Sequence, residues 1–282
     1  MAATIEFEGF TDQRLEEFRR WQGVSYGVLS EVRDRLRPGI TERRATVWAM
    51  QGFRREGADR YFHLPVALFG ERTALPEPWS TPSFWPTDRA LADGDAVILD
   101  ASPIFDGHVV DTSMSFTVGA TTDAGHAAMK GDDLTYRGTI LDAVRAGATF
   151  REIAHTVDAD LTARGYRNCH QLHPEAVLGH RMLHVAADLG GGTASDGSGF
   201  DTDVLRWFGR GIRAAVESGA PSPTWSDLPT SDHRPPPGLW AVEPHLAKDG
   251  IGVKWEEILV VEDNDAYWLS DDVPHLPRST SA

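Results

Sequence analysis

Four acidic side chains in strand-like segments are the residues of this sequence best suited to chemistry: Asp100, Asp111, Glu243 and Glu256. Asp100 ends an apolar run at residues 96–99, where a lone charge would be costly to bury. Taken singly, each acid is more readily interpreted as a solvated strand end. Four converging carboxylates, however, would repel one another unless cations neutralised them. Carboxylate oxygens with one imidazole suit divalent manganese, iron, cobalt or zinc, and two such ions form a hydrolytic centre.

An internal repeat gives these acids matched positions. Three residues of an early helical segment recur after a shift of 108 residues, so that Gly39, Thr41 and Gly57 match Gly147, Thr149 and Gly165. Asp100 lies six residues before Asp106-Gly107, and Glu243 lies six residues before Asp249-Gly250. Two unrelated helix–hairpin units are the alternative. We predict an α+β domain with two pseudo-symmetric halves, at about residues 12–119 and 130–264, whose hairpins face each other.

The periodicity of apolar residues predicts the elements that position the acids. Helical spacing covers residues 12–36, a segment after a Thr41 N-cap, and a segment that Gly147 ends. Residues 149–152 have the form of a capping box before a further helix. Strand–turn–strand units are expected at 95–119 and 239–262. Residues 188–237 are rich in Gly, Ser and Pro, and we interpret them as an insertion or lid rather than a linker. The tail at 273–282 is expected to be loose.

Composition excludes several classes of protein. The 282 residues carry 27 Lys+Arg against 42 Asp+Glu, a net charge of −15, which argues against binding to nucleic acid or to an anionic membrane. The single cysteine, Cys169, allows no internal disulfide, and we expect it to be a small buried residue. The first residues do not form a signal peptide, and the sequence contains no long apolar run, so we expect a cytoplasmic protein.

The motifs around the acids resemble those of the family that contains methionine aminopeptidase, prolidase and creatinase. The segments that carry the resemblance are ILDASPIFDGHVVDTSMSFTVG, VLGH, LWAVEPHL and VKWEEILVVEDN. The spacing of eleven residues between the two aspartates, followed in order by His, Glu and Glu, is the specific part of the match. The resemblance implies the pita-bread fold, a duplicated α+β domain around a curved antiparallel sheet. It therefore agrees with the internal repeat and implies one catalytic domain over residues 1–282.

The resemblance also implies roles for five metal ligands. Asp100 would bind one of two divalent ions, His180 and Glu243 would bind the other, and Asp111 and Glu256 would bridge them. Glu256 matches better than Glu257, which strand alternation would turn away from the site. A water held between two such ions loses a proton near neutral pH and becomes the nucleophile. Glu243 would also carry a proton to the leaving nitrogen.

Two substrate-site histidines usual in peptide-cleaving relatives are absent. The first would lie in GERTALPEPWSTPSFWP, where Glu77 or Ser83 takes its place, and the second falls on Ala187. His184, four residues after His180, is the candidate catalytic substitute. His63, Trp85 and His245 are the candidate substrate-binding residues. We also expect no extra N-terminal domain of the kind typical of prolidase and creatinase relatives, so that the substrate pocket would not be completed that way within one subunit, and a homodimer stays open.

Three functions are compatible with these features. The first is a metallopeptidase that removes an N-terminal residue or cleaves an Xaa-Pro bond in a short peptide. The second is a pita-bread metalloenzyme that breaks a C–N or similar bond in a small metabolite, as the missing histidines suggest. The third is a protein that keeps the fold to bind a partner. Because all five ligands are present, we favour a dinuclear metal-dependent hydrolase of the aminopeptidase type.

Overall fold

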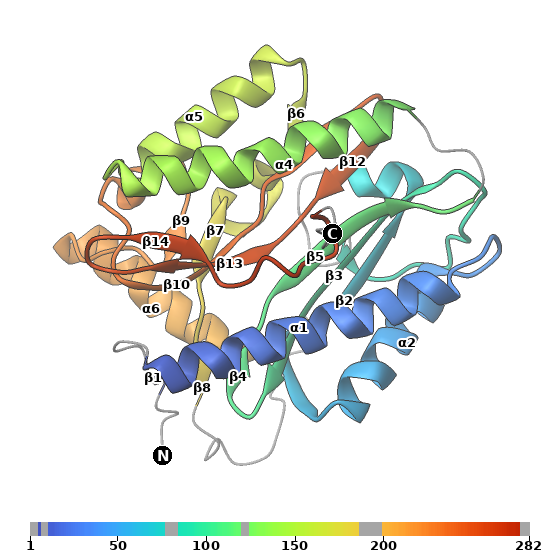
Figure 1. Ribbon diagram of the computed structural model, residues 1–282, viewed down its shortest axis with the longest axis horizontal. Helices are drawn as coiled ribbons and strands as arrows, with labels where there is room; N and C mark the ends of the chain where they lie inside the picture. The colour runs from blue at the N-terminus through green and yellow to red at the C-terminus, as the bar shows by residue number, and fades with distance from the viewer. Residues whose placement is uncertain (1–4, 7–10, 77–83, 120–123, 186–198, 277–282) are drawn as a thin grey trace, which may run out of the picture.

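The computed structural model describes residues 5–6, 11–76, 84–119, 124–185 and 199–276. Two pairs of helices enclose the sheets, one pair from each half of the sequence (Figure 1). The first pair is α1 (Asp12–Arg35) and α2 (Glu42–Arg55), and the second is α4 (Ala124–Arg145) and α5 (Phe150–Ala163). A fifth helix, α6 (Thr202–Ser218), lies outside these pairs. Among the described residues, no helix combines the length and apolar character needed to cross a membrane.

The N-terminal part of the chain supplies five strands of a six-stranded antiparallel sheet, and β8 from the C-terminal half is the sixth. Its order is β1-β8-β4-β3-β2, and β5 pairs with β3 as well. The strands are β1 (Ile5–Glu6), β2 (Ala58–Phe69), β3 (Ala96–Phe105), β4 (His108–Val109), β5 (Thr112–Thr117) and β8 (His184–Val185). β3 is buried along its whole length because β2 and β5 flank it and α1 packs against it.

The C-terminal half forms two smaller antiparallel sheets. The first has the order β14-β13-β10-β7-β9, from Ala266–Trp268, Glu257–Val261, Gly238–Val242, Gly179–Arg181 and Thr224–Trp225. The second has the order β12-β11-β6, from Ile251–Lys254, His245–Lys248 and Arg167–Asn168. The expected curved antiparallel surface is therefore divided into three hydrogen-bonded sheets.

The local signals in the sequence produce the expected turns and caps. Asp106-Gly107 and Asp249-Gly250 both have positive φ, at 47° and 79° and at 52° and 83°. Asp-Gly pairs tolerate this left-handed backbone, which matches the twist of the flanking strands and closes each hairpin. The side chain of Thr41 caps α2, and Thr149 with Glu152 forms the predicted capping box at α5.

The two halves meet where β5 runs beside β12 and the residues between β12 and β13. Ser113 forms a β-bridge with Glu256, and the Ser115 hydroxyl donates to the Lys254 carbonyl at 2.7 Å. This contact places the strand that follows Asp111 against the segment that carries Glu256. Separate apolar clusters under α1–α2 and under α4–α5 hold the two halves in place.

Two expectations concern whole segments, and one of them, the loose tail, needs correction. Within the interval 188–237, residues 188–198 lie outside the described part of the chain, but α6 walls a cavity and Trp225 is fully buried against Phe150. Part of this interval is thus packed core, and the position of α6 against the cavity is compatible with the expected insertion or lid. The tail is not loose at its start, because Val273 is buried and the His275 ring stacks on Trp255. Apolar and aromatic side chains explain both packings.

Candidate metal centre

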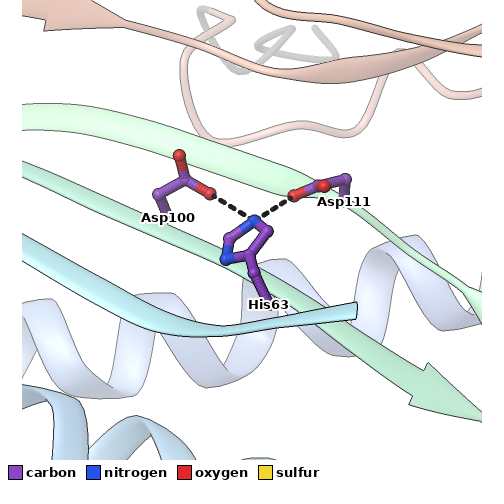
Figure 2. Close-up of side chains that lie close together, drawn as sticks. All are labelled: His63, Asp100 and Asp111. Carbon is purple, nitrogen blue, oxygen red and sulfur yellow. Dashed lines mark hydrogen bonds and ion pairs between the residues drawn. The ribbon is translucent and has the colours of Figure 1, made fainter. Parts of the chain in front are cut away.

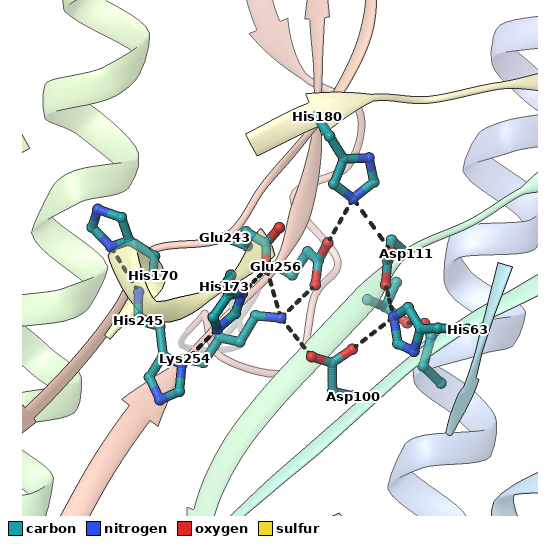
Figure 3. Close-up of polar contacts among 12 residues, drawn as sticks. His63, Asp100, Asp111, His170, His173, His180, Glu243, His245, Lys254 and Glu256 are labelled. Carbon is teal, nitrogen blue, oxygen red and sulfur yellow. Dashed lines mark hydrogen bonds and ion pairs between the residues drawn. The ribbon is translucent and has the colours of Figure 1, made fainter. Parts of the chain in front are cut away.

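The structure brings the five expected ligands together at the junction of the two halves (Figure 3). Asp100 lies within β3 and Asp111 just before β5, whereas Glu243 and Glu256 follow β10 and β12; His180 lies on β7. All five side chains are buried. Neighbours so distant in sequence meet because the hairpins of the two halves face each other.

Asp111 lies between two imidazoles. Its Oδ1 is 3.3 Å from Nε2 of His63, and its Oδ2 is 3.4 Å from Nε2 of His180. His63 also lies 3.6 Å from Oδ1 of Asp100 (Figure 2). His180 lies 3.7 Å from Oε1 of Glu256. The two oxygens of Asp111 therefore face two different groups of ligand atoms, as expected for a bridging carboxylate.

Lys254 is a central residue that the sequence analysis missed. Its Nζ lies 2.5 Å from Oδ2 of Asp100, 2.9 Å from Oε2 of Glu243 and 3.0 Å from Oε2 of Glu256 (Figure 3). The signal in the sequence is alternation, because Lys254 and Glu256 are two residues apart and share one face of an extended segment. The ammonium neutralises part of the negative charge, donates a hydrogen bond to Asp100 and forms ion pairs with Glu243 and Glu256.

The protonation of the centre follows from burial and these close charges. Although burial opposes ionisation of Asp111, the His63 and His180 imidazoles hold its pKa well below the usual range. Burial and the carboxylate of Asp111 raise the pKa of Glu256 to about 8. Burial opposes protonation of His63, but Asp111 and then Asp100 raise its pKa to about 9. The protein thus compensates these carboxylates with protons and with Lys254.

The donor set fits divalent ions. Oδ1 of Asp100 and Oε1 of Glu256 are buried and find no hydrogen-bond partner among the described residues. Oδ1 of Asp100 faces Nε2 of His63, and Oε1 of Glu256 faces Nε2 of His180. These side chains belong to two groups of potential ligands, His63–Asp100–Asp111 and Asp111–His180–Glu256. Ligand atoms about 2.1 Å from one ion lie about 3.0–3.5 Å apart, close to the distances seen here. Buried oxygens of this kind need a partner, and a cation supplies one.

Glu257 faces away from the centre. Its Oε1 accepts from Nε of Arg137 at 2.8 Å and lies 2.6 Å from Nε2 of His275. Glu256 instead points toward His180 and Lys254. The geometry therefore agrees with the choice of Glu256 over its neighbour as a ligand.

A short chain of histidines leads away from Glu243. Nδ1 of His173 lies 3.2 Å from Oε2 of Glu243, and Nε2 of His173 lies 3.2 Å from Nδ1 of His245. Nε2 of His245 donates to the Thr73 carbonyl at 2.7 Å, so in a neutral ring Nδ1 accepts from His173. Burial lowers the pKa of both rings. A hydrogen bond between His173 and Glu243 then requires a proton on one of the two groups.

The other expected site residues lie in different places. Trp85 is 38% exposed at the mouth of the cavity, and His63 lines its base. His245 is buried behind His173. His184 lies on β8, where its ring packs 4.7 Å from that of His108, and it is not among the described residues that line the cavity. The backbone after His180 carries His184 into the N-terminal sheet and away from the carboxylates. Glu77, Ser83 and Ala187 lie outside the described residues.

The centre forms the floor of a cavity of about 610 Å³. Apolar side chains from both halves make up most of its wall: Val47, Met50, Phe62, Leu64, Phe84, Trp85, Phe200, Leu205, Phe208 and Ile212. Arg43 and Glu175 are the charged residues that line it apart from the centre itself, within the described part of the chain. A cavity of this kind favours a small ligand with an apolar portion and polar atoms directed at the floor.

A duplicated α+β fold that closes over buried carboxylates and imidazoles defines the pita-bread class of proteins. The sequence matches the model of metallopeptidase family M24 over residues 16–263, and the chain belongs to that family. None of the curated proteins matches it. The expected family and fold are thereby confirmed.

Solved structures of the same fold are distant in sequence. The X-Pro aminopeptidase from Thermotoga maritima MSB8 is 18% identical, with a TM-score of 0.67 over 96% of this chain and 63% of its own. The prolidase from Pyrococcus furiosus is 16% identical, with a TM-score of 0.66 over 92% of this chain and 64% of its own. The Xaa-Pro dipeptidase from Bacillus anthracis is 19% identical, with a TM-score of 0.65 over 93% and 61%. This chain spans less than two thirds of the length of these structures.

Proposed function

We propose that this protein is a dinuclear metal-dependent peptidase that releases the N-terminal residue, or cleaves an Xaa-Pro bond, of a short peptide. The observation that carries the proposal is the set of four carboxylates and two imidazoles that line one mainly apolar cavity. The names of the similar structures, an X-Pro aminopeptidase and a prolidase, support the same substrate class.

Asp100, Asp111, His180, Glu243 and Glu256 would hold two divalent ions, for which manganese and cobalt are the first choices to test. When bound, such ions polarise the scissile carbonyl and lower the pKa of a water molecule. Lys254 keeps one oxygen of Asp100, Glu243 and Glu256 in a fixed direction, which orients the remaining oxygens toward the ions. Fixed ligand directions lower the ordering cost of binding, whereas the charge of the ammonium itself opposes a divalent cation.

Glu243 and His173 are the groups placed to move a proton. His173 lines the cavity and contacts Glu243 at 3.2 Å, so a proton taken up by this pair can be delivered to the leaving nitrogen. His245 and Thr73 fix the orientation of the His173 ring from behind. His173 thus supplies an imidazole near the substrate, which Ala187 does not.

The cavity wall argues for a small apolar substrate. Phe62, Phe200 and Phe208 pack edge-on or stacked around the approach to His180 and give this part of the cavity an apolar wall. A volume of about 610 Å³ accommodates a short peptide rather than a folded chain. We therefore expect an apolar residue, including proline, on at least one side of the scissile bond.

A non-peptide substrate is the second candidate function. Two features favour it, namely the absence of histidine at position 187 and in residues 71–86, and the presence of Lys254 among the ligands. In this case the same centre would break a C–N or similar bond of a small metabolite.

The deciding experiment is hydrolysis of a peptide panel by enzyme loaded with manganese or cobalt. The panel contains Met-Ala, Leu-Gly and Xaa-Pro peptides of two to five residues, with wild type beside Asp111→Ala. Cleavage that the variant loses supports the peptidase. Bound metal without cleavage of any peptide overturns it, and small amides and guanidino compounds then become the substrates to test.

A further inference from the structure

His63 repeats the arrangement of His180. Nδ1 of His180 donates to the carbonyl of the next residue, Arg181, at 3.2 Å, and Nδ1 of His63 donates to the carbonyl of Leu64 at 2.9 Å. In both rings Nε2 is therefore the atom that faces the carboxylates. Metal-binding histidines usually donate the other N–H to a carbonyl or carboxylate, which fixes the ring and its tautomer.

The backbone of β2 is shaped to present this ring. The pairing of β2 with β3 shifts register on both sides of His63, between Tyr61 and His63 and again between His63 and Val66. Irregularities of this kind redirect a side chain and are common beside active sites. The centroid of the Phe200 ring lies 5.8 Å from that of His63, so an apolar contact supports the imidazole. Nε2 of His63 points at Asp100 and Asp111 (Figure 2).

Because Lys254 engages oxygens of several carboxylates, an ion beside Asp100 has few remaining ligands, and His63 can supply one. The ammonium engages Oδ2 of Asp100 and Oε2 of Glu256, while Oε1 of Glu256 faces His180. An ion beside Asp100 is thus left with Oδ1 of Asp100, which has no hydrogen-bond partner among the described residues, and Oδ1 of Asp111. Nε2 of His63 lies 3.6 Å and 3.3 Å from these two oxygens. Three atoms of one ion's inner sphere have comparable separations.

We propose that His63 binds, through Nε2, the divalent ion that Asp100 and Asp111 hold, so that each half of the molecule contributes one imidazole to the centre. The inference rests on the proposed metal-dependent function. It replaces the expected role of His63 in substrate binding with a role in the ligand set. A nitrogen ligand at this position favours zinc, cobalt or iron over magnesium and calcium.

X-ray absorption of the wild-type enzyme loaded with two equivalents of cobalt tests the proposal directly. If His63 is a ligand, the spectrum fits one imidazole per ion on average, because His63 and His180 each bind one. Half an imidazole per ion in the wild type overturns the proposal, and it does so without any variant. Failure of the wild type to bind cobalt would instead contradict the metal-dependent function itself.

Metal titration of variants gives a second and independent result. His63→Ala should weaken one of two binding events by more than about 100-fold, beyond the 10–100-fold that loss of a supporting hydrogen bond costs. Free imidazole should restore part of this loss. His155→Ala, which removes an exposed histidine from α5, is the matched control and should bind both ions as wild type does. If His63→Ala and His63→Gln fold, bind two equivalents normally and differ from wild type only in KM, His63 is a substrate residue and the proposal is wrong.

Discussion

Nζ of Lys254 lies 2.5 Å from Oδ2 of Asp100, between carboxylates that come from opposite halves of the chain. Burial opposes a charged ammonium, but Asp100 and Glu243 together raise the pKa of Lys254 well above its ordinary value. The centre therefore carries a permanent cation of its own. This cation stabilises the protein without metal and also fixes which carboxylate oxygens remain for ions.

Lys254→Met should destabilise the metal-free protein by about 3–5 kcal/mol, because the removal of one partner from a buried ion pair leaves charge uncompensated. Divalent ions should restore most of this loss, so the metal-induced rise in Tm should be larger than in wild type. Calorimetry with chelator and with manganese measures both effects. Lys248→Met, on the neighbouring strand, is the control, and equal metal-induced shifts in wild type and Lys254→Met would contradict the role given to Lys254.

Asp111→Ala should lose bound metal and turnover together, because both oxygens of Asp111 face ligand groups. We expect activity to fall by about 1,000-fold or more, since the ions supply several kcal/mol of catalysis. Elemental analysis of the dialysed protein beside a kinetic assay checks this. Asp142→Ala removes an exposed acid from α4 and should change neither quantity; a fully metallated and active Asp111→Ala would refute the assignment.

Glu256→Gln and Glu257→Gln should impair different properties, metal binding in the first variant and stability in the second. The first should lose metal because Glu256 faces His180, whereas the second should keep metal and lose stability because Arg137 and His275 lose their buried carboxylate. The expected cost for Glu257→Gln is about 3–5 kcal/mol. Isothermal titration and urea unfolding of both variants make the comparison. Loss of a metal equivalent in Glu257→Gln would reverse the assignment of the ligand.

Asp133, which lies outside the metal centre, should make the free energy of unfolding depend on pH. Burial raises the pKa of its carboxyl well above the ordinary value, and its Oδ1 finds no hydrogen-bond partner among the described residues. When the pKa of an acid is higher in the folded than in the unfolded protein, its contribution to stability is fully present below the unfolded-state pKa. This contribution is lost as the pH rises from the unfolded-state pKa toward the folded-state pKa. The loss is about 1.4 kcal/mol per pH unit.

Asp133→Asn removes this dependence. Above about pH 4 the variant should be increasingly more stable than wild type, and its free energy of unfolding should vary less with pH. Urea unfolding from pH 4 to pH 8 measures the difference. A difference that does not change across this range would show that Asp133 ionises normally.

Much of the fold follows from local signals in the sequence. The Asp-Gly turns, the Thr149–Glu152 capping box and the apolar periodicity each depend on residues close in sequence, and the repeat shows that such units occur twice. Helix ends and hairpin positions can be predicted because hydrogen bonds and backbone conformations over a few residues determine them. The candidate metal ligands could also be named from the sequence, since their spacing lies within recognisable motifs, and the structure brings their side chains together.

Only the tertiary structure decided the roles of His63, Lys254 and His173. Each lies far in sequence from the carboxylate it contacts, as His63 does from Asp111 and Lys254 from Asp100. Irregular strand pairing aims His63 at the centre, and the same kind of non-local pairing carries His184 away to His108. The sequence by itself determined which elements form and which acids are the candidate metal ligands, because those depend on local spacing. The contacts between the halves depend on long-range packing, which no local pattern encodes.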